Sequence, residues 1–231
     1  MRTLILVSHP EEEESGTQRF LAEAIKDLPN VSRRVLSNEQ QKPFQAQAEM
    51  HDVILADRII WQFPLYWYSA PAVLHKWMSD CLITPYKEKL RGKELGIVVS
   101  IGRPENEFGM GKKQHYSLSE IFRPFAAIAA NLQMTMMPYF VSAQFEYQTE
   151  KQHQQLLIDY QQYVELSADF SFSSQEHWYV QRLEHLERQA TDPQRQNTLR
   201  LIKEQLSARS SHLSELKEEV AMIKNSEEGD Q

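Results

Sequence analysis

The sequence predicts an α/β protein with a doubly wound parallel sheet, followed by a helical extension. In the first 148 residues, apolar runs of strand length alternate with amphipathic stretches, which is typical of a sheet covered on both faces. Six of the seven glycines and nine of the ten prolines also fall there, so the architecture changes near residue 148. Right-handed crossovers make a doubly wound layout the natural closure of such a chain.

The first strand is expected at residues 3–8, where the run Thr-Leu-Ile-Leu-Val-Ser is almost wholly apolar. A helix is expected at 18–28, because its apolar residues recur on one helical face. Similar apolar runs predict the remaining strands at 31–36, 53–62, 95–101 and 134–141. Amphipathic spacing predicts further helices at 71–82 and 117–131.

The last part of the chain shows no strand pattern and almost no helix breakers. Helices are expected at 150–167, 176–190 and 194–224, the last one opened by Asp192 as N-cap and Pro193 at the first helical position. Along one face of the expected final helix runs an apolar seam of the kind that packs on another helix. It is formed by Leu199, Ile202, Leu206, Leu213, Leu216, Val220 and Ile223. We therefore expect a domain at 1–167 and a helical hairpin or arm at 168–231.

Composition and charge exclude several classes of function. The net charge of −7 disfavours binding of nucleic acid or an anionic membrane, since both partners require a basic surface. No apolar stretch approaches the roughly 20 residues of a membrane span, and the first apolar run closes too early for a signal peptide. The single cysteine, Cys81, cannot form an intramolecular disulfide. We expect a cytoplasmic protein that does not span a membrane.

Ligands of doubly wound sheets bind at the carboxyl ends of the strands, so three loops are candidates for a site: 9–18, 63–70 and 100–111. In the first loop, Ser15, Thr17 and Gln18 stand at the start of a helix, where backbone N–H groups attract anions such as phosphate. The alternative is that Ser15 is only an N-cap.

The other two loops have distinctive compositions. The second carries Phe63, Tyr66, Trp67 and Tyr68 between two prolines, which suits a flat ring ligand or, alternatively, an aromatic plug over the sheet edge. The third holds three of the seven glycines, which permit close approach of the backbone to a ligand but also serve ordinary turns. It carries neither a Rossmann nor a P-loop pattern.

The segment that runs from Trp61-Gln-Phe-Pro through Leu-Tyr-Trp-Tyr-Ser-Ala-Pro71 to Trp77-Met-Ser-Asp80 resembles a long motif of the flavodoxin-like NAD(P)H:quinone oxidoreductases. That family includes DT-diaphorase and the ancillary quinone reductases of potassium-efflux systems. The opening strand ending in His9-Pro10 and the loop at 100–103 add to the likeness, which covers residues 1 to about 165. It implies a five-stranded flavodoxin-like sheet in the order 2-1-3-4-5.

The resemblance further implies an enzyme that binds FMN, or FAD as in larger relatives. Such an enzyme takes hydride from NADH or NADPH onto flavin N5 and passes it to a quinone or similar acceptor in a ping-pong reaction. It implies that His9, Ser15, Thr17 and Gln18 hold the phosphate and that Ser100, Ile101, Gly102 and Arg103 border the pyrimidine edge. Residues of the aromatic loop would line the isoalloxazine: Pro64, Leu65, Tyr66, Trp67 and Tyr68, with Trp67, Tyr68 and Phe108 lining the hydride-transfer pocket.

The sequence departs from the family at two places. Ser100-Ile101-Gly102-Arg103 replaces a common Thr-Thr-Gly-Gly, so one hydroxyl and one glycine are lost, and Arg103 either supplies charge near flavin N1 or crowds the site. Phe108 stands where some members have a tyrosine that contacts substrate. An alternative function is therefore a catalytically altered regulatory or interaction protein that contacts a protein partner through its helical arm.

The resemblance implies a homodimer. No metal site is expected, because His75 and His115 have no acidic or cysteine ligands at suitable spacing. Cys81 lies among apolar neighbours and is interpreted as a core residue rather than a reactive thiol, and Trp77 as a packing residue.

Overall fold

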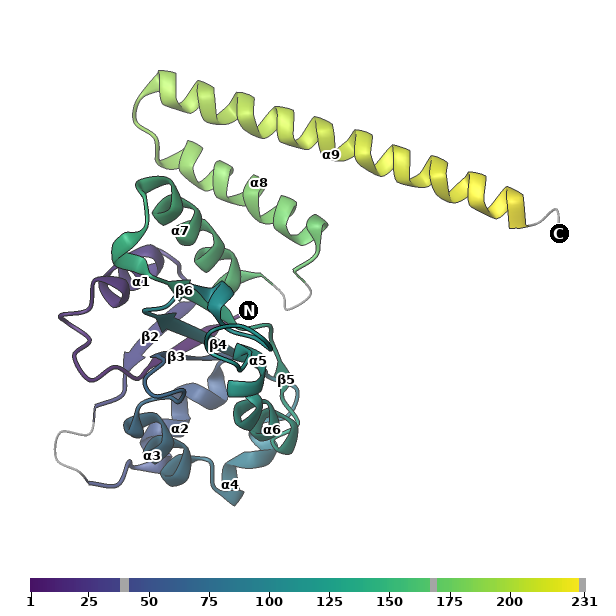
Figure 1. Ribbon diagram of the computed structural model, residues 1–231. Helices are drawn as coiled ribbons and strands as arrows, with labels where there is room; N and C mark the ends of the chain where they lie inside the picture. Colours follow the sequence, from purple (N-terminus) through teal and green to yellow (C-terminus); the bar gives the residue numbers. More distant parts are fainter. Residues whose placement is uncertain (38–41, 167–169, 229–231) are drawn as a thin grey trace. The chain divides into compact units, whose positions relative to one another are not determined.

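The structure is a computed structural model that describes residues 1–37, 42–166 and 170–228. The chain divides into two compact units, 1–168 and 169–231 (Figure 1). The expected domain boundary at 167/168 lies outside the described residues, and the division of roles between the two parts stays a prediction.

The first unit contains a parallel sheet in the order β2-β1-β3-β4-β5, with β6 also paired to β4, so the predicted α/β fold is confirmed. Its strands are β1 (Thr3–Val7), β2 (Val31–Val35), β3 (Arg58–Pro64), β4 (Glu94–Ile101), β5 (Thr135–Met136) and β6 (Phe140–Ala143). Its longer helices are α1 (Gly16–Ile25), α2 (Ala46–Leu55), α3 (Ala72–Cys81), α6 (Arg123–Asn131) and α7 (Glu150–Glu165). Shorter turns of helix are α4 (Thr84–Lys87), η1 (Glu88–Leu90), η2 (Glu105–Glu107), α5 (Leu118–Ile121) and η3 (Phe145–Tyr147).

The helices cover the two faces of the sheet, with α1 and α7 on one side and α2, α3 and α6 on the other (Figure 1). Both faces of β1 and β3 are buried, which accounts for the continuous apolar runs in the sequence. Successive side chains of a strand point to opposite faces, so Leu4 and Leu6 join the large apolar cluster with Trp61 and Trp77.

The fifth position of the sheet is occupied by two short strands rather than the single strand expected at 134–141. Leu95 of β4 is opposite Met136 of β5, whereas Val98 is opposite Phe140 of β6, so the outer segment contains one extra residue. Pro138 lies in this interruption and has no N–H to donate to the ladder. The bulge leaves backbone groups of β4 without ladder partners.

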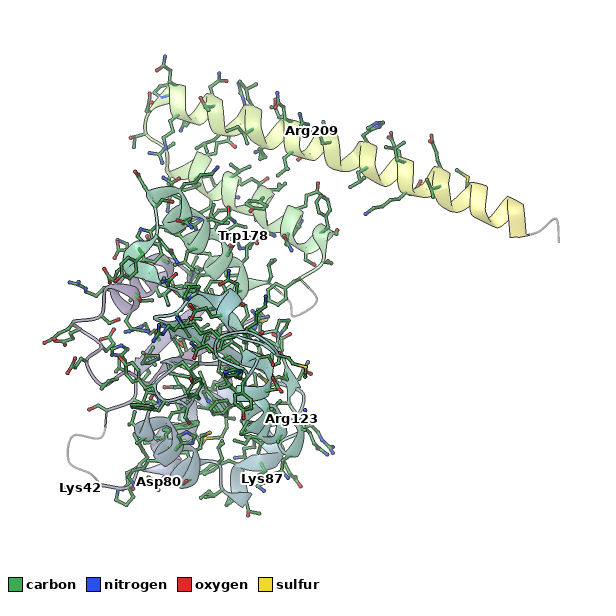
Figure 2. All side chains as sticks on the ribbon, in the orientation of Figure 1. Lys42, Asp80, Lys87, Arg123, Trp178 and Arg209 are labelled. Atoms are coloured by element: carbon green, nitrogen blue, oxygen red, sulfur yellow. The ribbon has the colours of Figure 1, made fainter. Side chains whose placement is uncertain are left out.

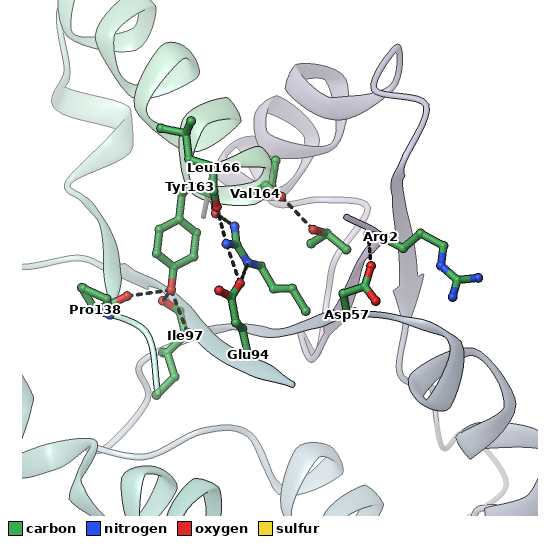
Figure 3. A network of polar contacts seen from close by, with 10 residues as sticks. Arg2, Asp57, Glu94, Ile97, Pro138, Tyr163, Val164 and Leu166 are labelled. Atoms are coloured by element: carbon green, nitrogen blue, oxygen red, sulfur yellow. Dashed lines mark hydrogen bonds and ion pairs between the residues drawn. The ribbon is translucent and has the colours of Figure 1, made fainter. Parts of the chain in front are cut away.

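A tyrosine of α7 takes the place of the missing ladder bonds (Figure 3). The Tyr163 hydroxyl lies 3.1 Å from the backbone N of Ile97 and 2.7 Å from the carbonyl oxygen of Pro138. Gly96 permits this approach, because a Cβ at that position would lie 2.7 Å from the same hydroxyl oxygen. The glycine, the bulge and the tyrosine therefore form one structural unit.

A buried arginine at the start of β3 holds the end of α7 (Figure 3). Arg58 is wholly buried, donates to the backbone carbonyls of Tyr163 and Leu166, and pairs with Glu94, with Nε 2.7 Å from the Glu94 carboxylate. A cation at a helix C-terminus satisfies carbonyls that have no partner within the helix. Arg58 thereby fixes α7 to the sheet.

Two further expectations about elements were wrong. Residues 53–55 belong to α2, not to a strand at 53–62, because Met50 and Val53 form the buried face of a helix that was not anticipated. The helix expected at 117–131 is two helices, which meet at Phe122, with Pro124 in the first turn of α6.

The second unit is a hairpin of α8 (Phe172–Gln189) and α9 (Pro193–Glu228), longer than the expected 176–190 and 194–224. Asp192 opens α9 as predicted, since its carboxylate accepts from the backbone N–H groups of Gln194 and Arg195. Lys203 of α9 forms an ion pair with Glu187 of α8 at 2.9 Å. Within the described ranges, no helix has the length and apolar character required to cross a membrane.

Candidate functional site

A cavity of about 260 Å³ opens at the carboxyl edge of the sheet, where four loops meet. Three of them are the loops after β1, β3 and β4, and the fourth follows β6. The lining consists of His9, Ser15, Thr17, Pro64, Leu65, Tyr66, Ser100, Ile101, Gly102, Ser142, Gln144, Phe145, Glu146 and Tyr147. Segments far apart in sequence are thus brought to the edge at which doubly wound sheets bind their ligands.

The start of α1 forms one end of this cavity. The Ser15 side chain caps the helix by accepting from the N–H of Gln18 at 3.3 Å, so the N-cap interpretation holds while Ser15 also lines the cavity. Unpaired N–H groups of a first helical turn carry a partial positive charge. This end of the cavity is therefore suited to an anion.

His9 stands beside the same end as a neutral donor. Its Nδ1 accepts from the N–H of Glu11 at 3.0 Å, which leaves the proton on Nε2. Burial lowers the pKa of His9 below 6.5, although the carboxylates of Glu12 and Glu11 oppose that shift. No lysine or arginine belongs to the described lining, so an anion here would be bound by neutral donors.

One buried side-chain polar atom of the lining has no hydrogen-bond partner in the described structure. Ser142 at the end of β6 is 1% exposed, and its Oγ makes no hydrogen bond within the described structure. A buried hydroxyl without a partner carries a desolvation cost of roughly 1–3 kcal/mol. A buried polar group of this kind calls for an explanation, such as a partner outside the protein chain.

The loop after β6 brings a carboxylate to the anion end. Glu146 packs against Gly16 so closely that a Cβ on Gly16 would lie 2.5 Å from Glu146 Oε1. Phe145 stacks on His153 at 4.4 Å between ring centroids, and Gln144 has a φ of +49°. The loop is therefore held by packing with an acidic side chain beside the first turn of α1.

The aromatic loop forms a tight turn with strained backbone. Tyr66 and Ser69 exchange backbone hydrogen bonds of 3.1 and 3.0 Å, while Trp67 and Tyr68 between them have φ values of +50° and +60°. Glycine or asparagine is usual at both positions of such a turn, and bulky residues there cost free energy. Strain of this kind concentrates at ligand sites.

The turn also directs donors and rings outward. The N–H of Leu65 donates to the Ser100 carbonyl at 2.9 Å and that of Tyr66 is used within the turn, so neither faces a ligand. Trp67 is 95% exposed, and the Tyr68 hydroxyl donates to Gln114 Oε1 at 2.8 Å, which links this turn to the glycine-containing loop.

Nine of the residues expected to hold a cofactor line the cavity together: His9, Ser15, Thr17, Pro64, Leu65, Tyr66, Ser100, Ile101 and Gly102. Four others, and Phe108 of the expected hydride-transfer pocket, lie outside this lining. Trp67, Tyr68 and Arg103 are exposed, Phe108 packs against the core, and Gln18 is buried with its Oε1 2.6 Å from Gln62 Nε2. Their expected ligand roles stay predictions.

The sequence did not predict the contribution of the end of β6, Ser142, and of the loop that follows it, Gln144, Phe145, Glu146 and Tyr147. The same rule that selected the other three loops applies to this one, since it also follows a parallel strand. It was overlooked because the last strand was expected to end at Val141 and the next helix to begin shortly afterwards.

Other side chains singled out earlier have structural surroundings. Cys81 is fully buried, and burial raises the pKa of its thiol to about 12. Trp77 is buried and donates to Glu49 at 2.9 Å, and His75 stacks on Phe125 with ring centroids 6.1 Å apart. Cys81 and Trp77 were interpreted as packing groups, and their burial agrees with that interpretation.

Comparisons with known proteins cover the first unit. A family model described as having the flavodoxin-like fold matches residues 1–164. A Bacillus subtilis protein named uncharacterized NAD(P)H oxidoreductase YdeQ is 36% identical over 146 residues, which are 61% of this chain and 74% of that protein. A P. pentosaceus structure described as an NADPH-quinone reductase is 42% identical with a TM-score of 0.68, covering 71% of this chain and 98% of the other.

A Treponema denticola structure, general stress protein 14 in complex with FMN, has the same fold at 22% identity and a TM-score of 0.64. It covers 71% of this chain and 98% of the other. The family match ends at residue 164, so α8 and α9 lie beyond it.

Proposed function

The chain belongs to the family of proteins with the flavodoxin-like fold, and we propose that it is an FMN-dependent NAD(P)H oxidoreductase that reduces a quinone or a similar acceptor. The names of its relatives, an NAD(P)H oxidoreductase and an NADPH-quinone reductase, support this activity. FMN is the cofactor that a neighbour of the same fold contains.

The observation that carries the proposal is the cavity itself. Its anion end combines the first turn of α1 with the hydroxyls of Ser15 and Thr17, and its wall contains the unpartnered Ser142 hydroxyl. Neutral hydroxyls and backbone N–H groups at a helix start are a donor set that fits a phosphate monoester. The residues present therefore fit the phosphate end of FMN, with Glu146 as the one acidic residue of the described lining.

The remaining lining suits the ring system. Pro64, Leu65 and Tyr66 supply an apolar wall, while the open space beside Gly102 admits a flat group near the end of β4. When bound, FMN would supply the redox chemistry, with N5 as the atom that exchanges hydride with NAD(P)H and with the acceptor. The lining residues would hold the ring and orient the two substrates against it.

The aromatic turn, Tyr66 to Ser69, would lie between the ring of FMN and the substrates. Two N–H groups, those of Trp67 and Tyr68, have no acceptor within the described structure and serve as donors to the ring edge. The exposed Trp67 indole supplies a planar surface for nicotinamide or quinone. Arg103 is exposed near the same edge and contributes positive charge there.

Reconstitution followed by turnover tests the proposal. The purified full chain is incubated with FMN and passed through a desalting column. NADH or NADPH is then added anaerobically to reduce the bound flavin, and menadione is added last. We expect a bound flavin spectrum that bleaches with the nicotinamide and returns with menadione. Uptake of neither FMN nor FAD, or bound flavin that NADH and NADPH leave oxidised, would overturn it.

The expected homodimer and cytoplasmic location belong to this proposal, and mass measurement of the reconstituted protein in solution tests the former. The alternative function is that of an interaction protein that contacts a protein partner through its helical arm. It predicts no flavin turnover, together with a complex that forms through the intact helical arm.

A further inference from the structure

The glycine-containing loop after β4 is closed on itself by backbone hydrogen bonds. The N–H of Gln114 donates to the carbonyl of Glu107 at 2.9 Å. The N–H of Gly109 donates to the carbonyl of Tyr116, also at 2.9 Å. Between these two bonds, the Phe108 side chain packs against the apolar core of the sheet domain. The loop is therefore compact and anchored to the domain.

The side chain of Gln114 joins this loop to the aromatic turn. Its Oε1 accepts from the Tyr68 hydroxyl at 2.8 Å, and its Nε2 donates to Glu107 Oε2 at 3.2 Å. The amide thus uses its acceptor toward the turn and a donor toward its own loop, a combination that no charged side chain supplies. An alanine at this position would leave both contacts unmade, and the turn would lose its link to the anchored loop.

The backbone of the aromatic turn requires support from its surroundings. Trp67 and Tyr68 have left-handed φ values, and such a conformation persists where neighbouring contacts hold it. On one side, Ser69 Oγ lies 3.1 Å from Nε2 of His75 on α3. On the other side, Gln114 is the one hydrogen-bond partner of the Tyr68 side chain among the described residues. The turn is therefore supported by α3 at Ser69 and by the loop after β4 at Tyr68.

The supported turn belongs to the candidate site. Tyr66 lines the cavity, and its ring meets that of His9 edge to face, with centroids 6.4 Å apart. A displacement of Tyr68 would move its own N–H, the N–H of Trp67 and the exposed Trp67 indole together. We propose that Gln114 is a positioning residue, which holds the aromatic turn in place for hydride transfer through its hydrogen bond to Tyr68. This inference rests on the proposed FMN-dependent function.

Amide hydrogen exchange in the flavin-free full chain tests the support of the turn without a cofactor. The N–H groups of Tyr66 and Ser69 are bonded across the turn, so their exchange rates report its opening. Gln114→Ala is expected to speed both by about two- to tenfold, the equivalent of one net hydrogen bond. Lys113→Ala is the control, because Lys113 also contacts Glu107, at 3.4 Å, and is 64% exposed. Exchange in Q114A that matches the unmodified chain would overturn the proposal.

Reduction of bound FMN separates positioning from a purely structural role. The reconstituted Q114A chain should bind FMN as tightly as the unmodified chain, because the proposed phosphate end lies at the first turn of α1. At saturating NADH or NADPH, we expect its flavin to be reduced several-fold more slowly in stopped flow. An FMN affinity that falls by the same factor as the rate, or an unchanged rate despite faster exchange, would mean that Gln114 serves the fold alone.

A double-variant cycle ties the effect to the bond between the two side chains. Tyr68→Phe removes the hydroxyl and Gln114→Ala removes its acceptor, so the double variant should exchange and react no differently from Y68F alone. Effects that multiply would show that the two residues act independently, against the proposal. Uptake of neither FMN nor FAD by the unmodified chain would overturn the proposed function and leave Gln114 no reaction to serve. Normal uptake and turnover that Q114A leaves unchanged would overturn only this inference.

Discussion

The Ser142 hydroxyl in the cavity wall is buried and has no hydrogen-bond partner in the described structure. Ser142→Ala removes a buried group that has no partner in the protein alone, so the free energy of unfolding of the flavin-free chain should be unchanged or slightly higher. FMN affinity should fall by about five- to tenfold, equivalent to about 1–1.4 kcal/mol. Fluorescence titration with FMN measures this, with the exposed Ser79→Ala as control. An unchanged affinity would place the hydroxyl outside the flavin site.

Substitution of Glu146 is expected to change FMN affinity in the opposite direction. Its carboxylate sits beside the first turn of α1, where the FMN phosphate is proposed to bind, and repels that charge. Glu146→Gln should therefore tighten FMN binding, by roughly tenfold at low salt and less at high salt. The same titration at two salt concentrations checks this. Weaker binding in E146Q would show that the carboxylate contacts the cofactor as an acceptor instead.

Strain at Trp67 gives a third prediction at this scale. The exposed indole makes few contacts, and an L-residue in the left-handed region costs roughly 1–2 kcal/mol. Trp67→Gly should leave stability in urea unchanged or raised by up to about 1 kcal/mol, while lowering kcat/KM for menadione, because the planar surface is lost. Trp67→Phe should keep more of the activity. Reduced stability with full turnover would mean that the residue serves the fold alone.

The sequence predicted site residues correctly where the position of a loop at the carboxyl edge of the sheet was enough. It failed where the packing of a helix decides which way a side chain points. Nine expected residues meet in the cavity because the edge rule places their loops together. Gln18 is in the right turn of α1 but faces Gln62 in the interior, a direction that only the packing of α1 on β3 determines. Ser142 and Glu146 were within reach of the same rule.

Among the elements, the bulged edge of the sheet is the feature with the clearest energetic consequence. Tyr163→Phe leaves the Ile97 N–H and the Pro138 carbonyl without the hydroxyl that they contact, and should lower the free energy of unfolding by about 1–3 kcal/mol. Urea unfolding measures the loss. Tyr116→Phe, at a side chain that is 61% exposed, is the control and should change it by less than about 0.5 kcal/mol. Equal effects would mean that the hydroxyl does not support the bulge.

The elements that the sequence mispredicts share a physical cause. The run from Val53 to Leu55 is β-branched and leucine-rich, so local propensity favours a strand, whereas burial of Met50 and Val53 makes it the end of α2. The apolar run at 134–141 is one stretch in sequence but is divided by the bulge at Pro138. Long-range packing decides both cases, while the strongly periodic tail helices were recognisable locally.

At the scale of the whole molecule, the family match covers the sheet domain, and the hairpin of α8 and α9 lies beyond it. The acidic excess follows the same division, because residues 149–231 hold nine basic and fifteen acidic residues. The proposed flavin chemistry concerns the first unit, which the family match covers.

The central claim is that the cavity at the carboxyl edge binds FMN. Titration of the flavin-free full chain with FMN, followed by quenching of flavin fluorescence, tests it most directly. The account predicts saturation at one FMN per chain, with weaker binding in S142A and tighter binding in E146Q. Fluorescence that stays unquenched at a large excess of protein, for FMN and FAD alike, would contradict it.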